Sequence, residues 1–391
     1  MLRSLPRFSS RLRRRADMFM PLSSNFRTRP FSSEAADATE DEYGKLESGT
    51  VLKQAEIRYK TFGELNEKGD NCVLVFHALT GNAAVDEWWA PLLGEGKLFD
   101  TSKYMVFCAN ILGSCYGSTG PNDINPGTQE RYGMEFPPVT VRDSVRSQKA
   151  ILDSLGVNHI RFAMGGSLGG MLTLEWGLEY GDTVDSLVVM ACGARETAWQ
   201  IAINETQRQA IFRDPNWEDG KGKAYGGLGL ARQIAMVSYR SHAAYNKKFG
   251  RKLTKEMEAE YGDADSAILN GKVPHYNVEG YLAYQDHKFL SRFDAASYVR
   301  CMGTLDSHDV GRSRGGIESA LKSLKMPTLV IGFDSDNLYP VSEQKELAAL
   351  IPDSELAILS SDAGHDAFLL EYEATQKACW EFFDKHHPNQ I

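Results

Sequence analysis

The sequence lacks the cysteine spacing of a disulfide framework or of a zinc site. Six cysteines are spread over 391 residues without a CxxC pair, and most of them lie in apolar stretches. Buried, reduced thiols are therefore expected, which fits a reducing compartment. The spacing of the potential ligands does not predict a metal site.

The sequence also lacks any apolar run near the roughly 20 residues that span a bilayer. The formal net charge of -9 argues against a general attraction to nucleic acid or to anionic lipid. We therefore expect a soluble protein whose partners are small molecules, with no nucleic-acid or membrane partner. An anionic ligand would have to be bound by a few local cations.

The first 33 residues differ in composition from the rest of the chain. They contain eight arginines and a single acidic residue, Asp17. This composition predicts a transit peptide over residues 1–33, and the arginine before Pro30-Phe31-Ser32 favours a mitochondrial destination with cleavage near Ser32. The same composition is compatible with a disordered basic tail, a plastid destination or a cytoplasmic protein. Residues 34–50 are acidic and polar, and are predicted to be a linker.

Short apolar runs then alternate with helical patterns, as in a mostly parallel, doubly wound α/β sheet. The runs have the length and composition of strands that are buried on both faces. Helices are predicted at Ser144–Leu155 and Met171–Glu179. The expected strands are Cys72–Phe76, Tyr104–Cys108, Ile160–Met164, Ser186–Met190, Thr328–Ile331 and Leu356–Leu359.

The alternation of strands and helices stops between about Thr197 and Arg300. This stretch is helical in pattern, is more charged and contains no convincing buried strand. Because strands resume at Thr328, we predict a helical lid at residues 197–300, inserted into one core domain that comprises residues 51–196 and 301–391.

A candidate nucleophile lies in Gly165-Gly-Ser-Leu-Gly169, which matches G-x-S-x-G between a predicted strand and a predicted helix. This context favours a catalytic Ser167, although a tight glycine-rich turn or a phosphate loop would look similar. The amides at the start of the following helix would face a developing oxyanion. Leu168 is expected to supply one such amide, and Leu79, which follows an early strand, the other.

A serine triad of this type also needs an acid and then a histidine, each after a later strand. Asp334 and Asp336 both follow the strand that ends at Ile331, and their spacing does not decide between them. His365 follows the last predicted strand and is the expected general base. Most of the other eight histidines are expected to be solvated.

Several blocks of sequence, taken together, are more specific than the serine motif alone. The chain resembles the homoserine O-acetyltransferases of the α/β-hydrolase type over nearly all of residues 50–385. The blocks that show this resemblance are His77–Gly81, Asn110–Pro121, Gly165–Met171, Leu174–Trp176, Ser291–Asp294, His308–Gly311, Ser335–Pro340 and Gly364–Phe368.

The resemblance implies an α/β-hydrolase fold and assigns further roles. It implies that Asp336 is the acid of the triad and that Asp366 binds the amino group of the substrate. It also implies that Arg232 and Tyr239 bind the substrate carboxylate, and their spacing of seven residues places both on one helix face. It implies acetyl-CoA as a cosubstrate, no bound cofactor and a homodimer through the lid helices.

The expected reaction is the transfer of an acetyl group from acetyl-CoA to the hydroxyl of L-homoserine through an acyl-Ser167 intermediate, in methionine biosynthesis. The same triad could use succinyl-CoA or L-serine, since one methylene changes binding by only about 1–3 kcal/mol. The sequence is also compatible with an esterase, in which water attacks the acyl-enzyme, and with a non-catalytic binding scaffold.

Overall fold

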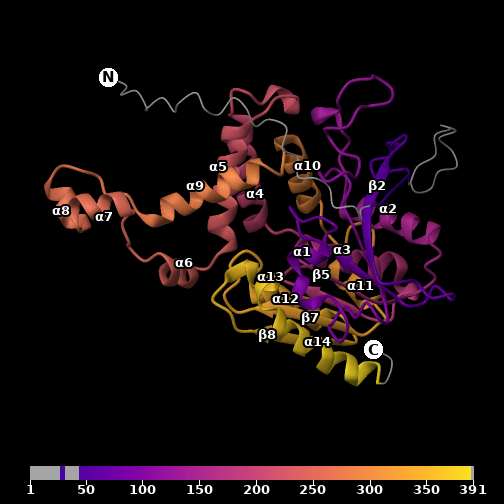
Figure 1. The fold of residues 1–391 in the computed structure, drawn as a ribbon. Coiled ribbons are helices and arrows are strands. Elements are labelled where there is room, and N and C mark those ends of the chain that lie inside the picture. Colours follow the sequence, from indigo (N-terminus) through magenta and orange to yellow (C-terminus); the bar gives the residue numbers. More distant parts are fainter. Residues whose placement is uncertain (1–26, 31–43, 389–391) are drawn as a thin grey trace.

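The computed structural model describes residues 27–30 and 44–388. Its centre is an eight-stranded sheet with the order β1-β2-β4-β3-β5-β6-β7-β8 (Figure 1). The first two strands are antiparallel to their neighbours, and the six from β4 to β8 are parallel. The strands are β1 Arg27–Pro30, β2 Glu56–Phe62, β3 Cys72–Phe76, β4 Met105–Ala109, β5 Ile160–Gly166, β6 Leu187–Met190, β7 Thr328–Phe333 and β8 Ser354–Leu359.

The prediction of an α/β-hydrolase fold with a mostly parallel sheet is confirmed. All six predicted strands are present. β8 was wrongly expected to be buried on both faces, because it lies at the edge of the sheet and Ile358 is 40% exposed. β2 was not predicted, because its buried Ile57 and Tyr59 alternate with Arg58 and Lys60 in place of a continuous apolar run.

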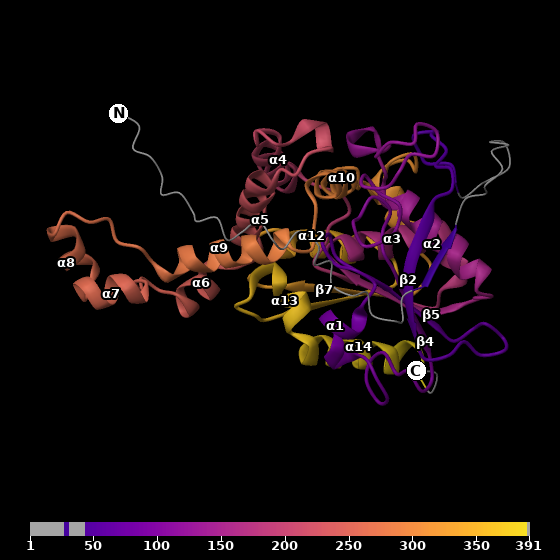
Figure 2. The same ribbon diagram turned by 45° about the horizontal axis from the view of Figure 1, so that its top comes forward.

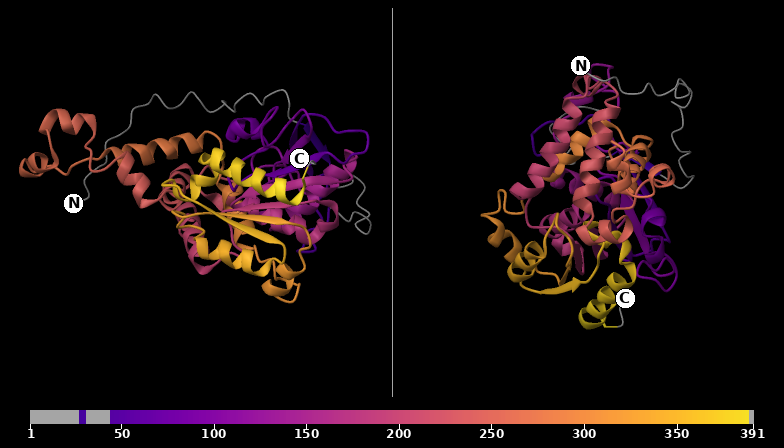
Figure 3. Two further views of the ribbon diagram at one scale, coloured as in Figure 1. Left: turned by 90° about the horizontal axis from the view of Figure 1, so that it is seen from below. Right: turned by 90° about the vertical axis from the view of Figure 1, so that its left-hand side faces the viewer.

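Helices cover both faces of the sheet, and alternate residues of each strand pack against one layer or the other. In β3, Leu74 belongs to the core under α2 (Val141–Ser154) and α3 (Leu168–Tyr180). The neighbouring Val75 belongs to the core under α14 (Tyr372–His386). The left view of Figure 3 shows the strands between these helical layers. The other core helices are α1 Val85–Trp88, α11 Ile317–Lys322, α12 Val341–Leu350 and α13 Ala367–Leu370.

A run of helices separates β6 from β7, in the stretch where a helical lid was predicted at residues 197–300. Its far end, α7 and α8, lies well away from the sheet (Figure 2). The predicted boundary at residue 300 falls inside α10, whose Tyr298 and Met302 belong to the core cluster. The helices are α4 Ala198–Phe212, α5 Tyr225–Tyr239, α6 His242–Lys248, α7 Lys255–Tyr261, α8 Ala264–Leu269, α9 Asn277–Leu290 and α10 Ala295–Asp306.

The cysteines and the helices of the described residues bear on two expectations from composition. All six cysteines are free, and only Cys115 is not buried. No helix in the described ranges combines the length and the apolar character needed to cross a membrane.

The N-terminal predictions overlap the described residues only in part. Of the predicted transit peptide, the structure describes Arg27–Pro30, which pair with β2; the rest lies outside the described residues. The linker prediction needs correction for residues 44–50. Leu46 is 3% exposed, and Glu47 forms ion pairs with Arg142 and Arg312, both at 3.0 Å. The acidic composition did not reveal these ion pairs, because the arginines that bind Glu47 come from distant parts of the chain.

We expect Glu47→Gln to lower the free energy of unfolding by about 1–3 kcal/mol, measured by urea denaturation. The Arg142 side chain is 5% exposed and would keep only Glu175 as an ionic partner, at 3.2 Å. Glu318→Gln is the matched control, because its pair with Lys322 is exposed to solvent and should matter little. Equal stabilities of the two variants would show that residues 44–50 are a loose lead-in.

Candidate active site

Ser167 occupies the sharp turn between β5 and α3. Its backbone has φ 59° and ψ -126°, a strained conformation for a residue with a side chain. The turn also needs its glycines. A Cβ on Gly165 would lie 2.3 Å from the carbonyl oxygen of Gly169, and a Cβ on Gly169 would lie 2.3 Å from that of Phe76. The turn thus places Ser167, 7% exposed, at the carboxyl edge of the sheet.

His365 and Asp336 meet at the same edge of the sheet, after β8 and β7 respectively. Nδ1 of His365 lies 2.7 Å from Oδ2 of Asp336, and both side chains are buried. The backbone amides of Leu338 and Tyr339 donate to Oδ1 of Asp336 at 2.8 and 2.9 Å, so the carboxylate is held at both oxygens. Asp334 is exposed and accepts from the Ser361 amide. The fold therefore selects Asp336 as the partner of His365, a choice that spacing left open.

The His365 loop packs directly on the serine turn. The ring of Phe368 lies so close to Gly166 that a Cβ there would be 2.4 Å from its Cδ2. The His365 ring packs on the same Phe368 ring, with 5.4 Å between the centroids. Because Nδ1 is engaged by Asp336, Nε2 is the ring nitrogen that this pair leaves available.

Two further carboxyl groups lie behind Asp336, and burial changes their charge. Burial raises the pKa of Glu196 to about 8 and that of Glu343 to about 7. The Tyr339 hydroxyl donates to Glu196, while the Tyr339 ring packs on His365 with centroids 5.1 Å apart. At neutral pH Glu196 is therefore mostly protonated and adds little negative charge, whereas Glu343 is partly ionised.

The loop after β3, where Leu79 lies, is held by a buried histidine. His77 is 1% exposed; its Nδ1 lies 2.8 Å from the Ala78 carbonyl oxygen, and its Nε2 accepts from the Ile111 amide at 3.2 Å. Burial lowers the pKa of His77 to about 4, so the ring is neutral with its proton on Nδ1. Since the Ala78 carbonyl and the Leu79 amide belong to one peptide unit, this bond fixes the direction of the Leu79 N–H.

Leu168 is the first residue of α3, so its amide is one of those that a helix leaves without an intrahelical acceptor. The structure thus places Leu168 at the start of the helix that follows Ser167, and Leu79 in the loop after β3. Their side chains are buried, and their amides are the groups available for chemistry.

The insertion places cationic groups near His365. On α5, the Arg232 guanidinium lies 5.8 Å from the Tyr239 ring centre, and the Tyr239 ring lies 5.8 Å from the His365 ring. Arg232 is half-buried and also stacks on Phe289 at 4.9 Å. It has no carboxylate within ion-pair distance among the described residues. Asp366 is already paired with Arg240, at 2.7 Å.

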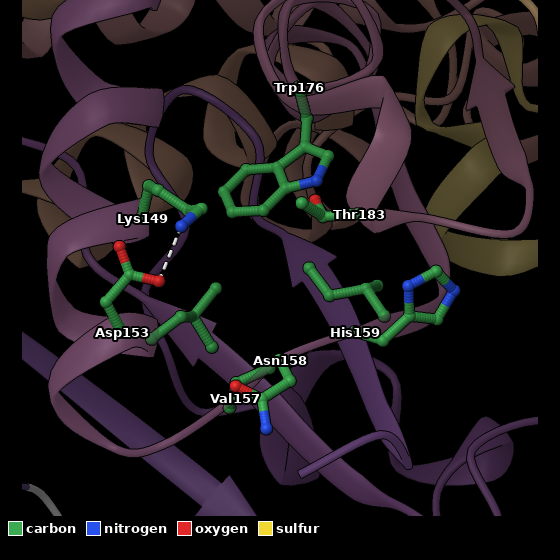
Figure 4. A pocket seen from close by; sticks show the side chains of 9 residues that line it. Lys149, Asp153, Val157, Asn158, His159, Trp176 and Thr183 are labelled. Atoms are coloured by element: carbon green, nitrogen blue, oxygen red, sulfur yellow. Dashed lines mark hydrogen bonds and ion pairs between the residues drawn. The ribbon is translucent and has the colours of Figure 1, made fainter.

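A separate cavity of about 190 Å³ lies between the end of α2 and α3, at the start of β5 (Figure 4). Lys149 and Asp153 pair with each other at its wall. Trp176 Nε1 also lines it and is buried without a hydrogen-bond partner among the described residues. Because β5 runs from this cavity to Ser167, the cavity is at the opposite edge of the sheet from the triad.

Reasoning from the sequence missed four residues that shape the site: Glu196, Tyr339, Arg240 and above all His77. Most of the other histidines are at least partly exposed, as expected, and the exceptions are His77 and His308, both buried. The position of His77 next to a buried apolar strand was the one available signal. In the described part of the chain, no three His, Cys, Asp or Glu side chains gather as they would around a metal ion.

Comparisons with known proteins agree with this geometry. The family model described as alpha/beta hydrolase fold matches residues 71–372. A homoserine O-acetyltransferase of Chloroherpeton thalassium is 43% identical over 341 residues, covering 86% of each chain.

Two solved structures share the fold at lower identity. The homoserine O-acetyltransferase of Bacillus anthracis superposes with a TM-score of 0.80 at 23% identity, over 92% of this chain and 98% of the other. The esterase E22 gives a TM-score of 0.79 at 24% identity, over 91% and 99%. These two likenesses concern the fold alone, whereas the extent and identity of the first relative's match show the family. The chain belongs to the homoserine O-acetyltransferase family, within the α/β-hydrolase fold.

Proposed function

We propose that this protein transfers an acetyl group from acetyl-CoA to the side-chain hydroxyl of L-homoserine, with Ser167 as a transient acyl carrier. The observation that supports this most directly is the His365–Asp336 pair packed on the serine turn, beside an Arg232 that has no ionic partner within the described ranges. A triad alone would serve an esterase equally well. The cation on the insertion favours an acceptor that bears a carboxylate.

In the first half-reaction His365 Nε2 takes the proton of Ser167 Oγ as the oxygen attacks the thioester carbonyl. The Leu79 and Leu168 amides bind the oxyanion, and each such donor is typically worth about 10²- to 10³-fold in rate. Collapse of the intermediate breaks the C–S bond. The sulfur of CoA takes the proton from His365, which leaves acetyl-Ser167 and free CoA.

In the second half-reaction the homoserine hydroxyl gives its proton to His365 and attacks the acyl carbon. A second oxyanion forms and collapses, the proton returns to Ser167 Oγ, and the acetyl ester leaves. Arg232 and Tyr239 bind the acceptor carboxylate, and Asp366 binds its ammonium group. The charges on α5 and at Asp366 match those of a zwitterionic amino acid.

Assembly and location are proposed on narrower grounds. We propose that the insertion, residues 197–300, is a lid that also forms a homodimer interface. Its helices expose large apolar side chains, which favours such a contact; among them are Trp199, Phe212, Leu230, Val237 and Tyr284. Light scattering of the purified protein tests this. A mitochondrial transit peptide is proposed from composition, and cleavage near Ser32 would remove β1; the N-terminus of protein isolated from cells tests both points.

A matrix of donors and acceptors tests the reaction. Acetyl-CoA and succinyl-CoA are each offered with L-homoserine, L-serine or no acceptor, while thiol release and product mass are followed. We expect acetyl-CoA with L-homoserine to give the largest kcat/KM and the O-acetyl ester. Acetate without ester would instead identify an esterase, and a preference for another pair would correct the substrates.

Ser167→Ala should lower kcat by about 10⁶, as expected when a triad acts as a unit. Thiol release and ester formation should fall together, because both pass through acetyl-Ser167. Ser154→Ala, at the end of α2, is the control and should keep normal turnover. Near-normal transfer by Ser167→Ala would refute the acyl-enzyme.

His77→Gln tests the neutral state of His77. A histidine with a folded-state pKa near 4 and an unfolded-state value near 6.5 stabilises the fold fully above pH 6.5 and loses that contribution as the pH falls toward 4. The loss approaches about 3 kcal/mol. In urea denaturation the variant should therefore be less stable than the wild type at pH 7.5, and the difference should shrink toward pH 4.5. Parallel stability curves would contradict a buried neutral ring.

A further inference from the structure

The junction between α5 and α6 lies against the loop that contains His365. Gly364 has φ +72°, and a Cβ there would lie 2.6 Å from the Ser241 nitrogen and 2.8 Å from the Tyr239 carbonyl oxygen. The Ser241 hydroxyl donates to the Asp362 carbonyl. Part of the insertion and the histidine loop thus form one packed unit.

Arg240 is the residue of this junction that reaches Asp366. Its Nε lies 2.7 Å from Asp366 Oδ2, and the two side chains are 28% and 17% exposed. The ion pair engages one carboxylate oxygen and leaves Oδ1 as an acceptor for a second cation. Asp366 directly follows His365 in the sequence. The available oxygen therefore belongs to the residue next to the expected general base.

The surrounding charges oppose the effect of burial on Asp366. Burial raises the pKa of Asp366, whereas Arg240, His365 and Arg232 lower it and Asp336 raises it further. Arg240 is the cation in direct contact. Without it, the half-buried Asp366 carboxylate would keep only the more distant charges of Arg232 and His365.

The two arginines have different surroundings, which indicates different tasks. Arg232 stacks on aromatic rings and has no carboxylate within ion-pair distance among the residues the structure describes. Arg240 forms an ion pair with Asp366, and its side chain also hydrogen-bonds Tyr281. Arg232 is thus a cation that could bind a carboxylate, and Asp366 is an anion that could bind an ammonium group. An α-amino acid carries both groups.

We propose that Arg240 is a positioning residue: it orients the Asp366 carboxylate so that its second oxygen binds the ammonium group of the amino-acid acceptor. This inference rests on the proposed function. It gives the insertion a role in acceptor choice beyond Arg232 and Tyr239, because an acceptor without an amino group gains nothing from Asp366.

Kinetic constants for the two half-reactions, measured separately, distinguish this positioning role from a general structural one. We expect Arg240→Gln to raise KM for L-homoserine about 10-fold or more, the scale of a hydrogen bond to a charged group. The kcat/KM for acetyl-CoA should stay within about twofold, since the donor step does not use Asp366. Arg240→Lys should restore part of the loss. Lys247→Gln, which removes a cation paired with exposed Asp362 at the same junction, is the matched control.

An acceptor that lacks the amine makes the test specific. With 4-hydroxybutanoate, the wild type and Arg240→Gln should have equal kcat/KM. An unchanged KM for L-homoserine would overturn the proposal. So would a lower KM, which would make Arg240 a competitor of the ammonium group, or an equal loss in both half-reactions, which would make its role structural.

Binding without turnover distinguishes this inference from the proposed function. Titration calorimetry compares L-homoserine binding to Ser167→Ala with binding to Ser167→Ala/Arg240→Gln. Weaker binding to the double variant supports the role of Arg240 even if the wild type transfers no acetyl group, a result that would refute the proposed function alone. Equal binding, or no binding to either protein at millimolar concentrations, overturns the role of Arg240 even if transfer is normal.

Discussion

The backbone at Ser167 is the constraint on which the rest of the site depends. A residue with φ 59° and ψ -126° is less stable than an extended or helical one by about 1–3 kcal/mol, so neighbouring structure must hold it there. β5 lies between β3 and β6 in the sheet, and the Ser167 amide donates to the Met190 carbonyl of β6 at 3.0 Å. The glycines at 165 and 169 let β5, α3 and the end of β3 approach more closely than a Cβ would allow. The buried centre of the sheet therefore holds the strained backbone of Ser167 in place.

Burial also determines which groups of the site are charged. His77 and Glu196 are both ionisable residues that the interior keeps neutral near pH 7, the first with a pKa near 4 and the second with a pKa near 8. Asp336 differs from Glu196 because two backbone amides and His365 bind its oxygens. Asp336 is thus the carboxylate bound directly to His365, while the neutral His77 and Glu196 add little charge of their own.

The insertion brings further polar groups to the edge of the sheet where His365 lies. The sheet belongs to a fold shared with esterase E22, and a fold of this kind supports many reactions. Arg232, Tyr239 and Arg240 all come from α5 or the residue after it. Since Gly364 and Ser241 join this helix end to the histidine loop, a substrate bound by α5 is bound next to the general base. In the proposed mechanism, the helix that binds the acceptor therefore also contacts the loop whose histidine transfers the proton.

The sequence by itself determined the parallel sheet, the inserted helices and the serine turn, because these follow from local patterns: apolar runs, helical periods and glycine spacing. Spacing left Asp334 and Asp336 undecided, and only the family resemblance pointed to Asp336. The sequence patterns also missed β2 and gave no role to His77 or Arg240. These outcomes depend on contacts between residues far apart in the chain. Asp336 is selected by the position of His365, the neutral state of His77 by burial beside Ile111, and the pairing of Arg240 by the approach of α5 to the loop after β8. Local sequence specifies the elements, and only their packing decides which polar groups meet and which of them lose contact with water.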